Sequence, residues 1–266
     1  MDNPPPARTG KRIKSVETAF EVLRFIGANG GANLPELTFH LDHSKSSLHY
    51  YLKTLMAERY VVENNGEYRL GLRLLEFGGL ALINQAFSNN IIMEAETLAE
   101  ETKETVIVAT EEAGKGICIY QSSHFEDRFG WHLGKDFFLH TNALGKVILA
   151  HYPEEYVFNI IERYGLPAQT ENTVTDQNNL LLELEKTRQT GVSFDKEECQ
   201  KEIKTIAAPI KSGSTVVGSI GLITDQSGAV LSQSDHYKAE RFKEKPSNVL
   251  SKHAQIISNK MEDEGL

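Results

Sequence analysis

The sequence has few cysteines and no long apolar run. Only Cys118 and Cys199 occur, and neither lies in a Cys-x-x-Cys pair or a Cys/His cluster with zinc-ligand spacing. We therefore expect two reduced thiols, no disulfide framework, no metal and no cofactor. No apolar run approaches the ~18 residues that a membrane span needs, and the N-terminus lacks the apolar stretch of a secretory signal. These absences predict a cytoplasmic protein with no membrane partner.

The sequence also lacks the common motifs of catalysis. It contains no nucleophile elbow, Walker loop, dinucleotide-binding fingerprint or HExxH sequence. Neither cysteine has a nearby histidine pattern that would activate its thiol as a nucleophile. We therefore expect no catalytic residues and no enzymatic activity.

A net positive charge is missing too, because the formal net charge is −9. This negative charge argues at first against a nucleic-acid partner. The charge is unevenly distributed, however. Residues 1–71 carry nine Lys and Arg against eight Asp and Glu, whereas residues 72–266 carry nineteen against twenty-nine. We expect residues 1–14 to form a disordered basic arm that follows a phosphate backbone or enters a minor groove, although a merely solvating tail fits as well. Its basic residues are Arg8, Lys11, Arg12 and Lys14.

Residues 33–71 have the pattern of two short helices followed by a β-hairpin. Asn33, with Glu36 three residues later, gives the start signal of a helix that ends near Leu41. Ser44 then caps a second helix. Tyrosine- and valine-rich segments at residues 60–63 and 67–70 flank an Asn-Asn-Gly turn, which is typical of a tight hairpin.

The second helix has an apolar face and a polar face. Its apolar residues recur at spacings of three and four: Leu48, Tyr51, Leu52, Leu55 and Met56. The polar face suits a DNA major groove, because hydroxyls and an imidazole reach base edges while lysines neutralise phosphates. We expect base-edge contacts from Ser46, Ser47, His49 and Tyr50, phosphate contacts from Lys45 and Lys53, and a backbone contact from Arg69 in the hairpin. The full set of expected DNA-binding residues is Ser44, Lys45, Ser46, Ser47, His49, Tyr50, Lys53 and Arg69.

These pieces, in this order, predict a winged helix-turn-helix over residues 15–71. Ser15 is expected to cap its first helix, whose apolar residues at helical spacing predict a core face: Val16, Ala19, Phe20, Leu23 and Ile26. Residues 72–88 are too apolar for a free linker and predict a connector helix. This helix is expected to pack against its counterpart in a second subunit, although packing within one chain is the alternative.

Residues 89–263 predict a second domain in which a mixed antiparallel sheet is flanked by helices, so the fold class is α+β. Helices are expected at residues 91–103, 141–151, 154–163 and 176–189, and strands at 105–112, 116–122, 192–194, 203–211 and 215–224. Residues 235–261 are polar and broadly helical, with an interruption at Pro246.

Several motifs resemble the IclR family of transcriptional regulators, and the resemblance covers nearly the whole chain. In the first domain these are SVETAFEVL at residues 15–23, SKSSLH at 44–49 and YRLG at 68–71. In the second they are HTNALGK at residues 140–146, similar to HATALGKA, and IAAPI at 206–210, similar to IAAPV. The resemblance implies a repressor or activator that binds a double-stranded DNA operator as a homodimer or as a dimer of dimers. It also implies a GAF-like effector-binding domain for a small molecule.

The start of the helix at residues 142–145 is a candidate anion site, because free N–H groups there favour a carboxylate. Alternatively, its Ala and Gly only let the helix lie close to the sheet. The resemblance favours the first interpretation, since effectors of this family are commonly small organic acids. The expected effector-binding residues are Asn142, Ala143, Leu144, Gly145, Asp195, Thr205, Gly221 and Ile223.

Some of these positions depart from the family pattern. Thr205 stands where a cysteine is common, and Gly221 and Ile223 stand where serines often occur. A ligand that needs those hydroxyls would leave its own polar groups unpaired, so either the effector differs in kind or the pocket is vestigial. Glu197 and Glu198 are interpreted as solvated acids. Four aromatic residues are candidates for the pocket wall or, more often at such spacing, for the core: Phe129, Trp131, Phe137 and Phe138.

A rival hypothesis is a GAF-like enzyme with an accessory helix-turn-helix, and a third is a winged helix that binds protein rather than DNA.

Overall fold

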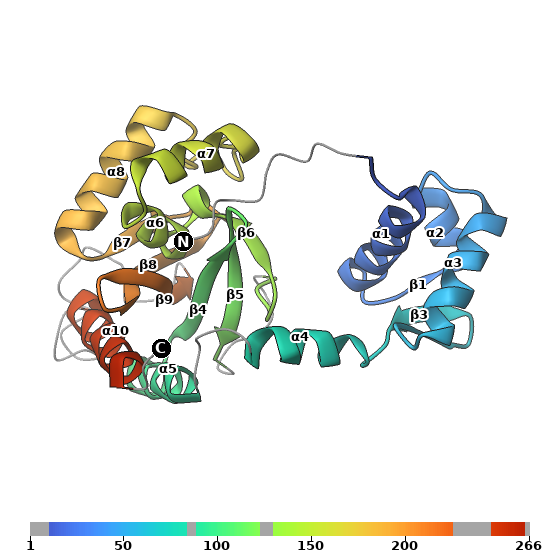
Figure 1. Ribbon diagram of the computed structural model, residues 1–266, viewed down its shortest axis with the longest axis horizontal. Coiled ribbons are helices and arrows are strands. Elements are labelled where there is room, and N and C mark those ends of the chain that lie inside the picture. Colours follow the sequence, from blue (N-terminus) through green and yellow to red (C-terminus); the bar gives the residue numbers. More distant parts are fainter. Residues whose placement is uncertain (1–10, 84–88, 123–129, 226–245, 264–266) are drawn as a thin grey trace. The chain divides into compact units, whose positions relative to one another are not determined.

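The computed structural model describes residues 11–83, 89–122, 130–225 and 246–263 (Figure 1). The chain divides into two compact units, Arg8–Gln85 and a second that begins at Ala86. Among the helices of the described residues, none has both the length and the apolar character to cross a membrane.

The first unit is a small helical bundle with a three-stranded antiparallel sheet of order β1-β3-β2. The hairpin expected from the Asn65-Gly66 turn is present, and both turn residues have positive φ angles of 53° and 84°. A two-residue strand that was not expected pairs Ala32 with Tyr68. The elements are α1 (Lys14–Ala28), β1 (Ala32–Asn33), α2 (Leu34–His40), α3 (Lys45–Ala57), β2 (Val61–Asn64), β3 (Glu67–Leu70) and α4 (Leu74–Ile83).

Two of the three expected helix caps in this unit are confirmed. Asn33 and Glu36 form a reciprocal capping box, with bonds of 2.9 and 2.8 Å. The Ser44 hydroxyl accepts a hydrogen bond from the Ser47 N–H at 3.2 Å. The prediction for Ser15 was wrong, because α1 begins one residue earlier and Ile13 occupies its N-cap position without a side-chain hydrogen bond.

The core face of α1 differs from the expected one. Val16 and Phe20 are 48% and 55% exposed, whereas the buried positions are Thr18, Val22 and Ile26. These three recur every four residues, so the buried stripe is narrower than the apolar pattern suggested. The polar Thr18 is tolerated on this face because its hydroxyl donates a hydrogen bond to the backbone carbonyl of Lys14.

The connector helix α4 has no buried residue. Leu75 is 66% exposed and Ile83 is 78% exposed, and the Leu72 that precedes the helix is 82% exposed. Its contact with its own chain includes the Phe77 ring, whose centroid lies 5.9 Å from that of Tyr60, and residues 84–88 of the expected connector lie outside the described residues.

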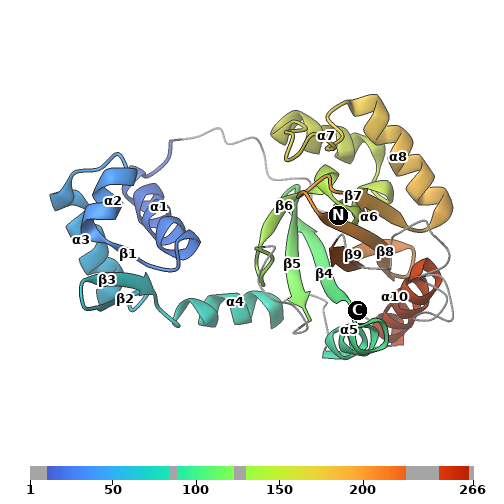
Figure 2. The ribbon, with the colours of Figure 1, turned by 180° about the vertical axis from the view of Figure 1, so that it is seen from behind.

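The second unit contains a six-stranded sheet of order β6-β5-β4-β9-β8-β7, in which every neighbouring pair is antiparallel. Helix α6 packs on one face of the central strands, and α5 and α10, which lie side by side, pack on the other (Figures 1 and 2). The elements are α5 (Asn89–Thr102), β4 (Thr105–Glu112), β5 (Lys115–Gln121), β6 (Asp136–Phe138), the 3₁₀ helix η1 (Leu139–Thr141), α6 (Ala143–Ala150), α7 (Glu154–Tyr164), α8 (Gln177–Thr190), β7 (Ser193–Lys196), β8 (Ile203–Ser212), β9 (Thr215–Asp225) and α10 (Pro246–Asp263).

The α+β class is confirmed. Strand β6 was not expected from the sequence. Helix α10 begins at Pro246, and a proline suits the first turn of a helix because it has no N–H to lose there. Residues 235–245 of the expected helix lie outside the described part of the chain.

Candidate functional site

The polar face of α3 is exposed, as the sequence predicts. Every expected DNA-binding residue on this helix and its cap is exposed except Ser47, which is partly buried. Tyr50 is 71% exposed although it is a large aromatic residue. Two neighbouring hydroxyls are already engaged, because the Ser44 Oγ caps the helix and lies 3.1 Å from the Ser46 Oγ. The turn before the helix is tied to α1 by His43, whose Nε2 lies 3.1 Å from a Glu21 carboxylate oxygen.

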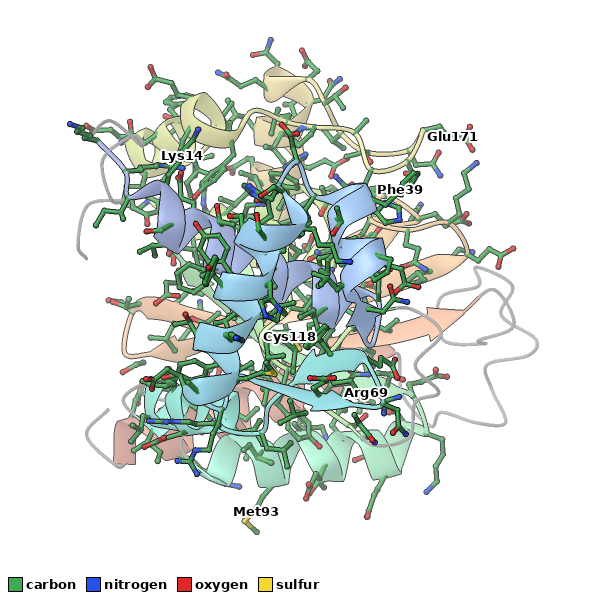
Figure 3. All side chains as sticks on the ribbon, turned by 90° about the vertical axis from the view of Figure 1, so that its right-hand side faces the viewer. Lys14, Phe39, Arg69, Met93, Cys118 and Glu171 are labelled. Carbon is green, nitrogen blue, oxygen red and sulfur yellow. The ribbon has the colours of Figure 1, made fainter. Side chains whose placement is uncertain are left out.

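The basic residues of this surface differ in whether an acidic residue compensates their charge. Lys45 and Lys53 form no ion pair with any residue in the described part of the chain. Arg69 lies on β3 (Figure 3) and pairs with Glu67 at 2.9 Å. Its charge is therefore partly compensated within the wing, and the two lysines carry most of the uncompensated positive charge.

The eight expected effector residues converge around the start of α6. In the sheet register Asp195 pairs with Thr205, which pairs with Ile223, and Gly221 lies two residues before Ile223 on the same face. Leu144 of α6 lies directly against Gly221. All eight residues are buried, so the surroundings of the helix start are closed to solvent.

The two glycines of this set permit close packing. A Cβ added to Gly145 would lie 2.2 Å from the carbonyl oxygen of Leu139, and one added to Gly221 would lie 2.8 Å from Leu144 Cδ2. In this conformation the small residues therefore let the helix lie close to the sheet, which is the alternative interpretation of the sequence.

Asn142 caps α6 through its Oδ1, which accepts a hydrogen bond of 2.9 Å from the Gly145 N–H. Asp195 Oδ1 accepts one of 2.7 Å from the Glu198 N–H. The second polar atom of each side chain, Asn142 Nδ2 and Asp195 Oδ2, has no hydrogen-bond partner among the described residues. Burial raises the pKa of Asp195 to about 7, and the nearby Glu198 carboxylate acts in the same direction.

Sequence analysis missed a buried charge cluster beside these residues. Lys146 is 1% exposed, and its Nζ donates to both Glu198 carboxylate oxygens, at 2.8 and 2.9 Å, and to Glu183 at 2.9 Å. The interpretation of Glu198 as a solvated acid was therefore wrong. Burial by itself lowers the pKa of Lys146, but the two glutamates outweigh it and hold this pKa above its ordinary value. The lysine is charged at neutral pH.

The Cys199 thiol lies beside the same groups. Burial raises its pKa to about 11, the Asp195 charge adds to this, and the polar side chains of Thr141 and Asn142 and the charge of Lys135 oppose it. A thiol held protonated in this way is a poor nucleophile. Cys199 therefore contributes packing beside the helix start.

The aromatic residues considered for a pocket wall belong mainly to the core. Trp131 and Phe137 are each 7% exposed, and their ring centroids are 5.1 Å apart. The Phe138 ring is covered by Lys115, whose Nζ lies 3.1 Å from the ring centroid. Phe129 lies outside the described residues.

Comparison with known proteins gives matches along both units. Residues 15–65 match the model of the IclR helix-turn-helix domain, and residues 85–243 match that of the bacterial transcriptional regulator IclR C-terminal domain. The regulator KdgR of Escherichia coli K12 is 28% identical over 201 residues, which cover 74% of this chain and 76% of that protein. The crystal structure of the Thermotoga maritima IclR is 25% identical and has a TM-score of 0.73, and the match covers 94% of this chain and 100% of that chain.

An IclR homologue from Microbacterium hydrocarbonoxydans, solved with 4-hydroxybenzoate, has the same fold. Its TM-score is 0.73 at 18% identity, and the match covers 94% of this chain and 99% of that chain. The two family models together account for both units of the structure, in the same order along the chain. The chain belongs to the IclR family and is a DNA-binding transcriptional regulator with a C-terminal ligand-binding domain.

Proposed function

We propose that this regulator reads its operator with α3 as the major-groove helix and responds to a small organic acid bound at the start of α6. The observation that carries the DNA part is the exposed polar face of α3, on which Lys45 and Lys53 have uncompensated charge. Ser46, Ser47, His49 and Tyr50 would contact base edges, and Arg69 would contact the backbone beside the groove. A regulator of this kind works in the cytoplasm, where its DNA partner lies.

The exposed apolar side chains of α4 support a homodimer. A two-fold protein places two recognition helices about 34 Å apart, one helical turn of DNA. An apolar helix in which no residue is buried by its own chain is suited to such an interface. Leu75→Glu with Leu80→Glu should lower the mass measured by light scattering. Leu182→Glu on α8 is the matched control, since Leu182 is 70% exposed and lies far from α4 in the sequence.

Effector binding at α6 is supported by the convergence of the eight residues and by the two buried polar atoms without partners. The relative from Microbacterium holds 4-hydroxybenzoate, an organic acid. In this chain the flexible end of Leu144 occupies the space over Gly221, so its rotation would make room for a ligand. A thermal-shift screen of small organic acids and sugar acids tests this part, because a ligand of the folded domain raises its melting temperature.

The DNA part is tested by selection from a random duplex pool with the full-length protein, followed by fluorescence anisotropy on the enriched sequence. An enriched motif with two half-sites supports the proposal. Failure to enrich any sequence, with the fold intact, would favour the protein-binding winged helix instead.

A further inference from the structure

Two buried polar atoms without partners mark one spot at the start of α6. Asn142 is 0% exposed and Asp195 is 1% exposed, yet Asn142 Nδ2 and Asp195 Oδ2 have no hydrogen-bond partner among the described residues. A buried polar atom that nothing binds destabilises the folded state, because it has lost its hydrogen bonds to water. Helix α6 packs against β7, and the Cys199 thiol lies beside both side chains, so the two side chains lie on facing elements. A donor and an oxygen beside one helix start suit a ligand that has a carboxylate.

The buried cation near Asp195, Lys146, is already paired and is not free for an added anion. Lys146 on α6 is already bonded to Glu198, in the turn after β7, and to Glu183 on α8. On the β8 side, Asp195 faces the neutral Thr205. Burial keeps the neighbouring Cys199 thiol protonated, although the charge of Lys135, an exposed residue, acts on it in the opposite direction. An anionic ligand would therefore meet the carboxylate of Asp195 without a buried, unpaired positive charge to separate them.

Two carboxylates in contact in a dry site do not both ionise. If Asp195 is neutral, its Oδ2 carries a proton and becomes a donor, while Oδ1 keeps its bond from the Glu198 N–H. Asn142 Nδ2 supplies a second donor. Together they give a carboxylate two hydrogen bonds beside the N–H groups of the first turn of α6.

We propose that this site binds a small carboxylate together with one proton. Asp195 takes this proton from solvent, keeps it on Oδ2 and uses it to donate a hydrogen bond to the ligand. The inference rests on the proposed effector site and adds that the response depends on pH. The pKa of Asp195, raised by burial to about 7, places the protonation change within the physiological range. Binding is then tighter on the acid side of neutrality.

The test is isothermal titration of the full-length protein with pyruvate, benzoate and 4-hydroxybenzoate at pH 6 and pH 8. Each measurement is repeated in two buffers of different ionisation enthalpy, which gives the number of protons taken up. We expect the dissociation constant to be about tenfold weaker at pH 8 and close to one proton to be taken up there.

Asp195→Asn is the informative variant because its amide mimics the protonated acid. Its Oδ1 can still accept from the Glu198 N–H, and its Nδ2 stands where the Oδ2 proton would be. This variant should bind equally at both pH values, with no proton uptake. Glu197→Gln is the matched control, since that partly buried carboxylate lies two residues away, and it should behave as the wild type.

The outcomes separate this inference from the proposed function. Binding without proton uptake in the wild type, or an unchanged pH dependence in Asp195→Asn, would overturn the proton coupling and leave the effector site standing. If none of the three acids binds at either pH, the small-acid effector is wrong and the inference fails with it.

Discussion

The buried Lys146 offers a quantitative test of how the second unit is held together. Its Nζ lies 2.8 Å from Glu198, and the two side chains are 1% and 9% exposed. Lys146→Met leaves the Glu198 charge buried without its cation, beside Asp195. Removing one partner of a buried pair costs about 3–5 kcal/mol. We expect Lys146→Met to lower the free energy of unfolding by an amount in this range.

The double variant Lys146→Met with Glu198→Gln should recover much of that loss, because no uncompensated charge remains. A coupling energy of about 2–3 kcal/mol between the two positions is expected. Trp131 makes the assay specific: it is the only tryptophan, and it is buried in the core of the second unit. Its fluorescence during urea unfolding therefore follows that unit alone.

Lys201 and Glu171 provide the control cycle. Their ion pair has a similar length of 3.2 Å, but the side chains are 67% and 76% exposed, so solvent screens it. The corresponding Met and Gln variants should show a coupling near zero. If the Lys146–Glu198 cycle also gave a coupling energy near zero, the buried pair would not be a determinant of stability, and the reasoning from burial would be refuted.

Three further predictions concern DNA affinity, pH and packing. Lys53→Ala should weaken DNA binding at all sequences and reduce the slope of log affinity against log salt by about 1, as anisotropy titrations would show; an unchanged slope contradicts its phosphate contact. Because burial raises the pKa of Asp195 from 3.8 to about 7, the folded state holds a proton that the unfolded state releases, so stability should fall as pH rises from about 4 to 7. Asp195→Asn should remove that contribution. The urea midpoints of wild type and variant should therefore differ by different amounts at pH 5 and at pH 8, and an equal difference at the two pH values would refute this prediction. Gly145→Ala should destabilise more than Gly221→Ala in the same assay. Its methyl would lie 2.2 Å from the Leu139 carbonyl oxygen, whereas that of Gly221→Ala would meet the flexible end of Leu144 at 2.8 Å and the Ile206 carbonyl oxygen at 3.0 Å, and the reverse order would contradict this packing.

The features that the sequence predicted well are those that depend on neighbours along the chain. Asn33 and Ser44 each cap a helix through the N–H three residues later, as the structure shows. A cap of this kind needs only one turn of helix and the right side chain, so it can be read locally. The hairpin turn at Asn65-Gly66 follows for the same reason.

What the sequence did not predict depends on contacts between distant segments. Glu198 looks like a surface acid until the turn after β7 is placed over Lys146, 52 residues earlier in the chain. The exposed side of α1 could not be chosen from its periodicity, because Val16 and Phe20 fit an apolar stripe as well as Val22 does. Tertiary packing selects among such stripes, and it also pairs the two-residue strand β1 with β3.

The polar groups near the start of α6 also limit the chemistry of the proposed ligand. On the sheet face beneath α6, Gly221 and Ile223 supply no hydroxyl, so the polar atoms near the helix start belong mainly to Asn142, Asp195 and Thr205. Those groups can satisfy one carboxylate but not a series of hydroxyls. A sugar acid would leave several hydroxyls buried without partners, each costing about 1–3 kcal/mol. A compact apolar body with one carboxylate avoids this cost, so this lining favours such an acid.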